Sequence, residues 1–411
     1  MKRISHRWPL PAALATAFIL LSGCVVGPNY RPIAPSLPAA FASQADLDSR
    51  PVSQPAPALE SWWTGFDDPE LVSIIDRVLA QNLELSAAAA RVAQARAAAE
   101  QAGAQRYPEA HLDGSIAAQH QSLQSPIGKI ASAFPGYERD QALRDIDAGA
   151  SWELDLFGGL KRGAQAASAD AQAAEALQQG IRVTIAAEAA DAYFRLRGLR
   201  ERITLTQAQI DTDEQLLQLV GRRQDAGVAT DLEISQAQAL LSHARAALPP
   251  LKSAAALQSN RLDVLMGMPA GAYAGELRAA TAHYRIPSID AAAGPAQLLR
   301  QRPDVIAAER RLAASSARIG VAVAEYYPSV SLSALLGFES LNGGALIQSA
   351  SFQPAAIAGL RWHLFDFGRI DAQVAQARGA NLEALANYRQ SMLSATAVEP
   401  SGCARNSISS V

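Results

Sequence analysis

Residues 152–160, Trp-Glu-Leu-Asp-Leu-Phe-Gly-Gly-Leu, decide the fold, because their pattern recurs 210 residues later at 362–370 as Trp-His-Leu-Phe-Asp-Phe-Gly-Arg-Ile. A second pair of segments, 91–108 and 311–328, is offset by 220 residues, and each segment ends in Tyr-Pro. Two anchors with nearly equal offsets indicate an internal repeat. Each unit is predicted to run from a helix through Tyr-Pro, a strand, a long polar loop, a second strand and Phe-Gly into a long helix.

The predicted strands alternate between apolar and polar residues, so that each face of the sheet carries one kind of side chain. Such alternation is typical of a membrane barrel, but a half-buried sheet in a soluble protein shows it equally. Trp152 and Trp362 occupy matching positions and fit an aromatic girdle at the membrane interface. The alternating apolar positions are Ala148, Ala150, Trp152, Leu154 and Leu156 in the first unit and Val330, Leu332, Ala334, Leu336, Leu360, Trp362 and Leu364 in the second.

The number of strands limits how a barrel could close. Two pairs give four strands, whereas closed membrane barrels have at least about eight. An open sheet edge cannot lie in lipid, because its backbone N–H and C=O groups would have no hydrogen-bond partners. The chain is therefore expected to oligomerise: two copies would reach the minimum, and three would make a twelve-stranded tube.

The N-terminal segment predicts export and a lipid anchor, which favours the membrane interpretation of the strands. Basic residues precede a short apolar run at 10–21, as in a cleaved signal peptide. The sequence Leu21-Ser22-Gly23-Cys24 matches a bacterial lipoprotein box, in which Cys24 becomes the acylated N-terminus. The alternative is an ordinary signal peptide with a chance cysteine. Val25 is not acidic, so the usual cue for retention in the inner membrane is missing and the outer membrane is the expected location.

Composition narrows the class of protein further. The formal net charge of −3 gives no electrostatic reason to expect nucleic acid. No run of 18 or more apolar residues follows Cys24, so a transmembrane helix is not expected. The other cysteine is Cys403, and with Cys24 committed to lipid no intramolecular disulfide is expected. The proline-rich stretch up to about residue 59 predicts an extended tether, after which Asp68-Pro69-Glu70 predicts a helix start.

Two segments predict helices that are long for a compact domain. Residues 160–200 contain almost no proline, and residues 232–266 carry apolar side chains at heptad spacing. Pro249-Pro250 is expected to bend the second helix. A generic helical core is the alternative to a wall of packed coiled-coil hairpins. The heptad positions are Ile234, Leu241, Leu248, Ala255 and Leu262 in one series and Ala237, Ala244, Leu251, Gln258 and Leu265 in the other.

A short turn is predicted to join these helices into a hairpin. Gly227 can end the incoming helix in the left-handed conformation. Thr230-Asp231-Leu232-Glu233 is a capping box that starts the outgoing helix. A rigid tip on a long antiparallel pair suits docking of a partner, although a plain helical turn would have the same sequence.

Three motifs resemble the outer-membrane factor family, in its branch of NodT-type efflux lipoproteins similar to TolC and OprM. They are Cys24-Val-Val-Gly27-Pro28-Asn-Tyr30-Arg-Pro32, then Trp62-Trp63-x-x-Phe66-x-Asp68-Pro69-x-Leu71, then Arg302-Pro303-Asp304-Val305-x-Ala307-Ala308-Glu309-Arg310. The resemblance implies a mixed α/β membrane protein: a homotrimer with a twelve-stranded outer-membrane barrel, four strands from each chain, and a periplasmic barrel of α-helical coiled-coil hairpins. It also implies a tripartite pump that exports drugs or other small toxic compounds, with a periplasmic adaptor protein and an inner-membrane transporter of the RND class. The adaptor-docking tip would comprise Arg222, Gly227, Val228, Ala229, Thr230 and Asp231.

The expected organisation departs from the family near the C-terminus. We expect a signal peptide at 1–23, a lipidated tether at 24–61, a first repeat at 62–286, an incomplete second repeat at 287–397 and an atypical tail at 398–411. The abrupt change of composition after residue 397 suggests a frameshift or premature stop. The second long hairpin and the acidic gate of the family would then be missing, which puts closure of the periplasmic tube in doubt.

No enzyme chemistry is expected. The sequence lacks Gly-x-Ser-x-Gly, a phosphate-binding Gly-Lys loop and His-Glu-x-x-His, and Gly158-Gly159 is not a full dinucleotide fingerprint. No cofactor is implied, and no carboxylate or cysteine pattern completes a metal site around His111 and His120. A passive channel is the leading hypothesis. The alternatives are a type I secretion duct, a lipid-anchored coiled-coil scaffold without a pore, and a non-functional remnant of a channel gene.

Overall fold

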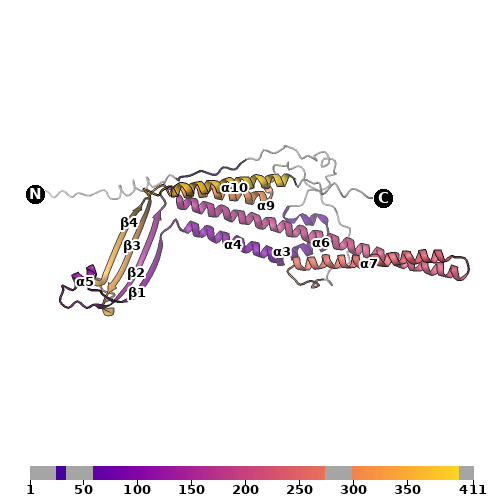
Figure 1. Ribbon diagram of the computed structural model, residues 1–411, viewed down its shortest axis with the longest axis horizontal. Coiled ribbons are helices and arrows are strands. Elements are labelled where there is room, and N and C mark those ends of the chain that lie inside the picture. Colours follow the sequence, from indigo (N-terminus) through magenta and orange to yellow (C-terminus); the bar gives the residue numbers. More distant parts are fainter. Residues whose placement is uncertain (1–24, 34–58, 274–298, 398–411) are drawn as a thin grey trace. The chain divides into compact units, whose positions relative to one another are not determined.

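The computed structural model describes residues 25–33, 59–273 and 299–397 (Figure 1). The predicted signal peptide, Cys24, most of the tether and the tail at 398–411 lie outside the described residues. Contacts divide the chain into two compact units. Of the described residues, 25–33, 94–173 and 307–397 form the strand unit, and 59–93, 174–273 and 299–306 form the hairpin unit.

A four-stranded antiparallel sheet defines the strand unit, which confirms the predicted number of strands. The order is β1-β2-β3-β4, so the two middle strands join the first repeat to the second. The polar loops between paired strands hold the short helix α5 and two 3₁₀ turns, η2 and η3. The bounds are β1 Glu109–His120, α5 Pro126–Ala131, β2 Asp140–Leu154, β3 Ser329–Ser340, η2 Gly343–Ala345, η3 Ser349–Ser351 and β4 Phe352–Arg361.

The internal repeat is also confirmed. Helices α4 (Leu83–Ala104) and α9 (Pro303–Ala324) each have 22 residues, and β1 and β3 each have 12. The long helix α6 begins at Gly159, and α10 (Arg369–Ala397) begins 210 residues later. The second strands differ, because β2 has 15 residues and β4 only 10. The sequence prediction that Leu156, Trp362 and Leu364 belong to strands is therefore wrong: β2 ends at Leu154 and β4 ends at Arg361.

Small side chains form the helical core of the strand unit. Alanine lines the buried surfaces of the N-terminal part of α6 and of α9, which suits close approach of helices. Polar contacts join these helices at their margins: Arg318 of α9 pairs with Asp170 of α6, and Asn381 of α10 donates to the hydroxyl of Ser315. The buried alanines here are Ala166, Ala169, Ala171, Ala173, Ala307, Ala314 and Ala317.

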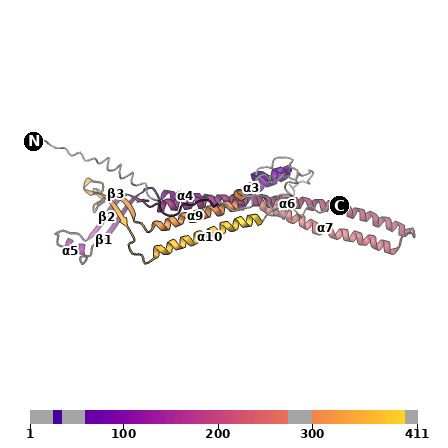
Figure 2. The same ribbon diagram turned by 90° about the horizontal axis from the view of Figure 1, so that it is seen from above.

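The two long helices that the sequence predicts lie in the hairpin unit, except for the first part of α6, up to Ala173, which belongs to the strand unit. Helix α6 runs to Asp225 and has 67 residues in all, well past the predicted end near residue 200, and α7 is Asp231–Leu265 (Figures 1 and 2). All ten heptad positions of α7 are buried or half-buried, which confirms the predicted seam. Pro249 and Pro250 lie inside α7, and the helix continues through them. Among the described helices, none is both long and apolar enough to cross a membrane.

The largest apolar cluster lies in the hairpin unit, where a 3₁₀ helix, η1 (Leu59–Phe66), and helix α3 (Pro69–Gln81) pack against α6 and α7. Apolar residues of α3 recur at helical spacing and face this cluster. Buried apolar side chains each contribute about 1.5–3 kcal/mol, so the cluster holds the helices together. Its members include Trp63, Leu71, Ile75, Val78, Ile185, Ala189, Leu196 and Leu262.

A buried carboxylate fixes the start of α3 to α6. Asp68 caps α3 as predicted, because its Oδ1 accepts from the backbone N–H groups of Glu70 and Leu71. Its Oδ2 accepts from the Tyr193 hydroxyl at 2.9 Å and from Arg197 Nη1 at 2.8 Å. The Asp68 side chain is only 2% exposed, so this charge depends on those partners. The pKa of Tyr193 is raised, mainly by burial and next by the hydrogen bond to Asp68, so the Tyr193 hydroxyl stays neutral and can donate.

Replacing Asp68 by alanine should destabilise the hairpin unit by about 3 kcal/mol, because it removes a cap and deprives Arg197 of its buried carboxylate. Thermal or urea unfolding followed by circular dichroism would measure the loss. Asp76→Ala is the matched control, since Asp76 is an exposed residue of the same helix. Equal stability of the two variants would contradict the role of Asp68.

Candidate functional site

The register of the sheet sorts its side chains onto two chemically different faces. Odd-numbered positions of all four strands share one face, and even-numbered positions share the other. The even face is apolar except toward the loop end of the sheet, where His120, Asp140, Arg144 and Ser340 lie. Its apolar side chains are open: Leu112 is 71%, Ile116 76% and Leu360 70% exposed. The odd face is polar, with exceptions such as Leu335 and Ile357. Its polar members are Glu109, His111, Asp113, Ser115, Gln119, Gln141, Asp145, Asp147, Ser151, Glu153, Ser329, Ser331, Ser333, Glu339, Gln353 and Arg361.

Glycines on the polar face receive side chains from the neighbouring strand. The imidazole of His111 lies over Gly149, and the carboxylate of Asp147 lies over Gly337, so that a Cβ at either glycine would collide with it. Each glycine is the register partner of the residue that covers it. These polar groups therefore lie against the sheet instead of standing upright from it.

The two histidines singled out in the sequence do not come together. His111 is on the polar face, 3.3 Å from Asp113, whereas His120 is on the other face and contacts Asp140 at 2.6 Å. Within the described ranges, no group of three or more His, Cys, Asp or Glu side chains could hold a metal ion.

The tryptophans predicted at the membrane interface tie the strand ends to the preceding helices. Trp152 Nε1 donates to the carbonyl of Arg106, and Trp362 Nε1 donates to the carbonyl of Tyr326, each at 3.0 Å. Arg106 and Tyr326 are themselves 220 residues apart, so the contact is duplicated with the repeat. The structure thus brings each indole to an equivalent junction, a contact that periodicity could not reveal.

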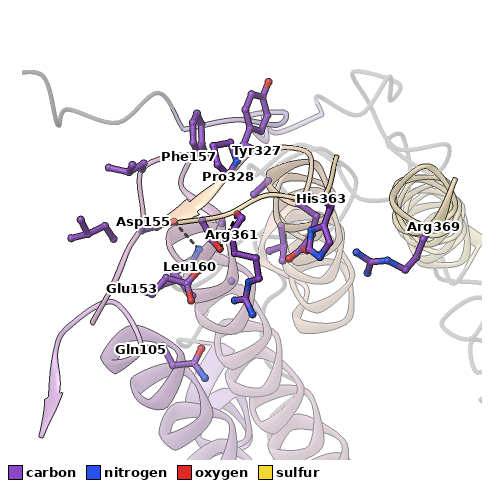
Figure 3. A pocket seen from close by; sticks show the side chains of 18 residues that line it. Gln105, Glu153, Asp155, Phe157, Leu160, Tyr327, Pro328, Arg361, His363 and Arg369 are labelled. Atoms are coloured by element: carbon purple, nitrogen blue, oxygen red, sulfur yellow. Dashed lines mark hydrogen bonds between the residues drawn. The ribbon is translucent and has the colours of Figure 1, made fainter. Parts of the chain in front are cut away.

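The junction between strands and helices contains a polar pocket of about 580 Å³ (Figure 3). Phe157 and Tyr327 stack at one side, with ring centroids 4.5 Å apart. Asp155 accepts from the backbone N–H groups of Leu160 and Lys161 and so caps α6. Asp155 follows the last residue of β2, and its contacts give it the role of a helix cap.

The hairpin tip, residues 222–231, has the backbone that the sequence predicts. Gly227 has φ +72°, and the N–H of Val228 donates to the carbonyl of Arg223 at 2.8 Å. Across the turn, Gln224 Nε2 donates to Asp231 Oδ1 at 2.6 Å. The predicted docking residues are exposed, apart from Ala229, which is half-buried. Val228 is 65% exposed and puts an apolar side chain at the end of a rigid turn.

The capping box is formed in both directions. The Thr230 hydroxyl accepts from the N–H of Glu233, and the Glu233 carboxylate accepts from the N–H of Thr230 at 2.6 Å. This backbone hydrogen bond, with the one from the Thr230 hydroxyl, lowers the pKa of Glu233 below its ordinary 4.5. Because its pKa is lower in the folded state, the Glu233 carboxylate stabilises the fold at pH values above 4.5. This contribution is lost as the pH falls through the lowered pKa.

Comparison with known proteins gives consistent results. The family model described as outer membrane efflux protein matches residues 74–268 and 294–398. Nodulation protein T of Rhizobium leguminosarum bv. trifolii is 31% identical over 326 residues, 79% of this chain and 66% of the relative. The pyoverdine export outer membrane protein OpmQ of Pseudomonas putida is 32% identical over 349 residues, 84% of this chain and 73% of the relative.

Solved structures share the fold. The outer-membrane channel OprN superposes with a TM-score of 0.74 and 33% identity, covering 91% of this chain and 81% of OprN. The outer membrane protein VceC from Vibrio cholerae superposes with a TM-score of 0.72 and 27% identity, covering 82% and 79% of the two chains.

Replacing Gly227 by alanine should loosen the hairpin tip, because a side chain in the left-handed region costs about 1–2 kcal/mol. We expect amide exchange at Val228 and Ala229 to become roughly tenfold faster, as measured by hydrogen–deuterium exchange. Gly221→Ala is the matched control, since Gly221 lies within α6 with open space around it. Faster exchange in both variants, or in neither, would contradict the assignment.

Proposed function

Because the chain belongs to the outer membrane efflux protein family, we propose that three copies form the exit duct of a tripartite efflux pump. The family consists of outer-membrane channels and not of enzymes, and its fold combines long helical hairpins with four antiparallel strands in each chain. The strands lie in the outer membrane and the helices in the periplasm. The trimeric state of this chain, its anchor and its partners are our proposals.

The proposal rests on one observation: the sheet has two open edges, and one of its faces is apolar while the other is polar. The order β1-β2-β3-β4 leaves β1 and β4 at the edges, and neither edge could lie in lipid unpaired. Pairing β4 of one copy with β1 of the next closes twelve strands from three chains. The apolar face then meets lipid, and the polar face lines a water-filled lumen.

We propose the hairpin tip as the docking point for a periplasmic adaptor protein, which links the duct to an inner-membrane RND transporter. The exposed Val228, the exposed Arg222 and the rigid Gly227 turn support this role. A preorganised turn loses little conformational entropy when a partner binds it.

Cys24 is proposed as the lipid attachment site, after removal of a signal peptide at 1–23. Multiple acyl chains at about 0.8 kcal/mol per buried methylene make a lasting anchor. Similarity to proteins named for pyoverdine export, solvent efflux and toluene efflux supports small-molecule cargo. Transport through the duct is passive, and the charge and width of the lumen influence which compounds pass.

Channel formation can be tested on protein extracted in detergent from isolated outer membranes. We expect a native mass of three chains and ion conductance when this protein is inserted into planar bilayers. A trimer without conductance would instead support a lipid-anchored scaffold. A monomer or an aggregate would contradict the duct.

Adaptor docking can be tested by placing a photo-crosslinking amino acid at Val228 in cells that express the pump. We expect an adduct that mass spectrometry identifies as a periplasmic adaptor. Leu257 is the matched control, because it is 64% exposed on α7, away from the turn. An adaptor adduct at Leu257 and none at Val228 would exclude the tip as the docking point.

A further inference from the structure

Residues 25–33, which we call the N-terminal strap, are bound along the helices of the strand unit. The N–H of Val26 donates to the carbonyl of Phe157 at 3.1 Å, where β2 gives way to α6. Tyr30 donates to Glu309 of α9 at 3.1 Å, and the hydroxyl of Tyr388 in α10 donates to the carbonyl of Ile33 at 3.4 Å. The strap thus contacts three helices, although its proline-rich sequence predicts a tether.

Arg162 of α6 is the centre of this contact. Its Nε donates to the carbonyl of Val26 at 3.1 Å, and its Nη2 donates to the carbonyl of Gly27 at 3.2 Å and to Asn29 Oδ1 at 2.8 Å. The Arg162 side chain is buried, at 4% exposure, and a buried cation is costly unless it is hydrogen-bonded. Three of the acceptors that compensate this cost belong to the strap. The fixed fork of a guanidinium can reach several acceptors at once, which a lysine ammonium cannot reproduce.

The backbone shape of the strap is matched to the helix surface. Gly27 has φ +86°, and a Cβ there would collide with the backbone of Gly320 in α9. A Cβ at Gly320 would in turn lie 2.8 Å from Cγ of Arg162. Val25 packs on Gly158, which is itself in the left-handed region. Glycines on both sides therefore make room for the strap and for the arginine that holds it.

The far end of the strap is held by a partly buried hydroxyl. Burial, together with the neighbouring Glu309 carboxylate, raises the pKa of Tyr30 well above its ordinary value. The phenol therefore remains a neutral donor to Glu309 throughout the physiological range. Contacts at both ends of residues 25–33 give the strap a fixed register on the helices.

We propose that Arg162, Gly320 and Gly158 form a binding site for the chain's own lipopeptide N-terminus, and that occupying this site fixes where the lipid anchor enters the membrane. The proposal rests on lipidation of Cys24, which precedes Val25 directly in the sequence. Val25 is seated at the end of β2, the end of the strand that also carries Trp152. An anchor attached there is held level with the interfacial tryptophans, whereas a loose tether would leave the depth of the strands unspecified.

Binding of the strap can be measured without reference to the lipid. In detergent-purified protein we expect the amides of residues 25–33 to be protected from hydrogen exchange, and exchange to become about tenfold faster in Arg162→Met. Arg318→Met is the matched control, because Arg318 is 54% exposed on α9 and pairs with Asp170 instead of the strap. Asn29→Ala removes one acceptor without altering a helix, and it should give a smaller increase even where Arg162→Met fails to fold.

The positioning role is tested in cells by comparing palmitate labelling with the fraction of chain recovered as an outer-membrane trimer. We expect labelling to be equal in the wild type, Arg162→Met, Gly27→Ala and Arg318→Met. The trimer fraction should fall several-fold in Arg162→Met and Gly27→Ala and remain unchanged in Arg318→Met.

Three outcomes would overturn the proposal. The first is free exchange of residues 25–33 in the wild type, and the second is unchanged protection in Arg162→Met. The third is loss of protection with an undiminished trimer fraction, which would show that the strap binds but positions nothing. Absence of palmitate from the wild type would instead refute lipidation of Cys24 in the proposed function, and the exchange measurement would still decide whether the strap binds.

Discussion

The need to pair every backbone hydrogen-bonding group in lipid governs this structure. An amide left without a partner in hydrocarbon costs several kcal/mol, and a four-stranded sheet presents a whole row of such groups at each edge. The sheet β1-β2-β3-β4 is therefore stable in a membrane only as part of a closed ring. The segregation of apolar and polar side chains by residue parity follows from the same requirement, because a closed ring has an outside and an inside. The helices begin where the strands end, and there backbone pairing is internal to each helix.

The features of the fold that the sequence predicts correctly are mostly local motifs and short periodic patterns. The capping box at Thr230 and the left-handed Gly227 depend on residues within one turn, and the heptads of α7 repeat every two turns. The structure confirms each of these predictions. Alternation likewise located the strands, because a period of two is visible in any short window. Alternation does not predict where β4 ends. Trp362 and Leu364 continue the alternating pattern, although the backbone pairing ends at Arg361.

Contacts between distant residues could not be predicted from the sequence. The local sequence predicts that Asp68 caps a helix, but no neighbouring residue indicates that Asp68 also pairs with Arg197, 129 positions away. Arg162 gives no local signal either, because two of its acceptors in the strap are backbone carbonyls, which every residue has, and the third, Asn29 Oδ1, lies 133 positions away. The indole contacts of Trp152 and Trp362 were hidden for the same reason. Of the predicted site residues, those of the tip have the expected geometry, and their docking role remains a prediction.

Duplication of the strand pair has a consequence for the electrostatic pattern of the duct wall. On the polar face, β1 and β2 carry Asp113, Asp145 and Asp147, whereas the corresponding positions of β3 and β4 carry Ser333, Ala355 and Ile357. In the proposed ring of three chains, the two hairpins of each chain would occupy alternate sectors. Such a ring would have six sectors around its axis, and sectors rich in carboxylates would alternate with sectors of lower negative charge. Because separate stretches of sequence encode the two hairpins, a substitution in one hairpin would change the charge of three sectors and leave the other three unaltered.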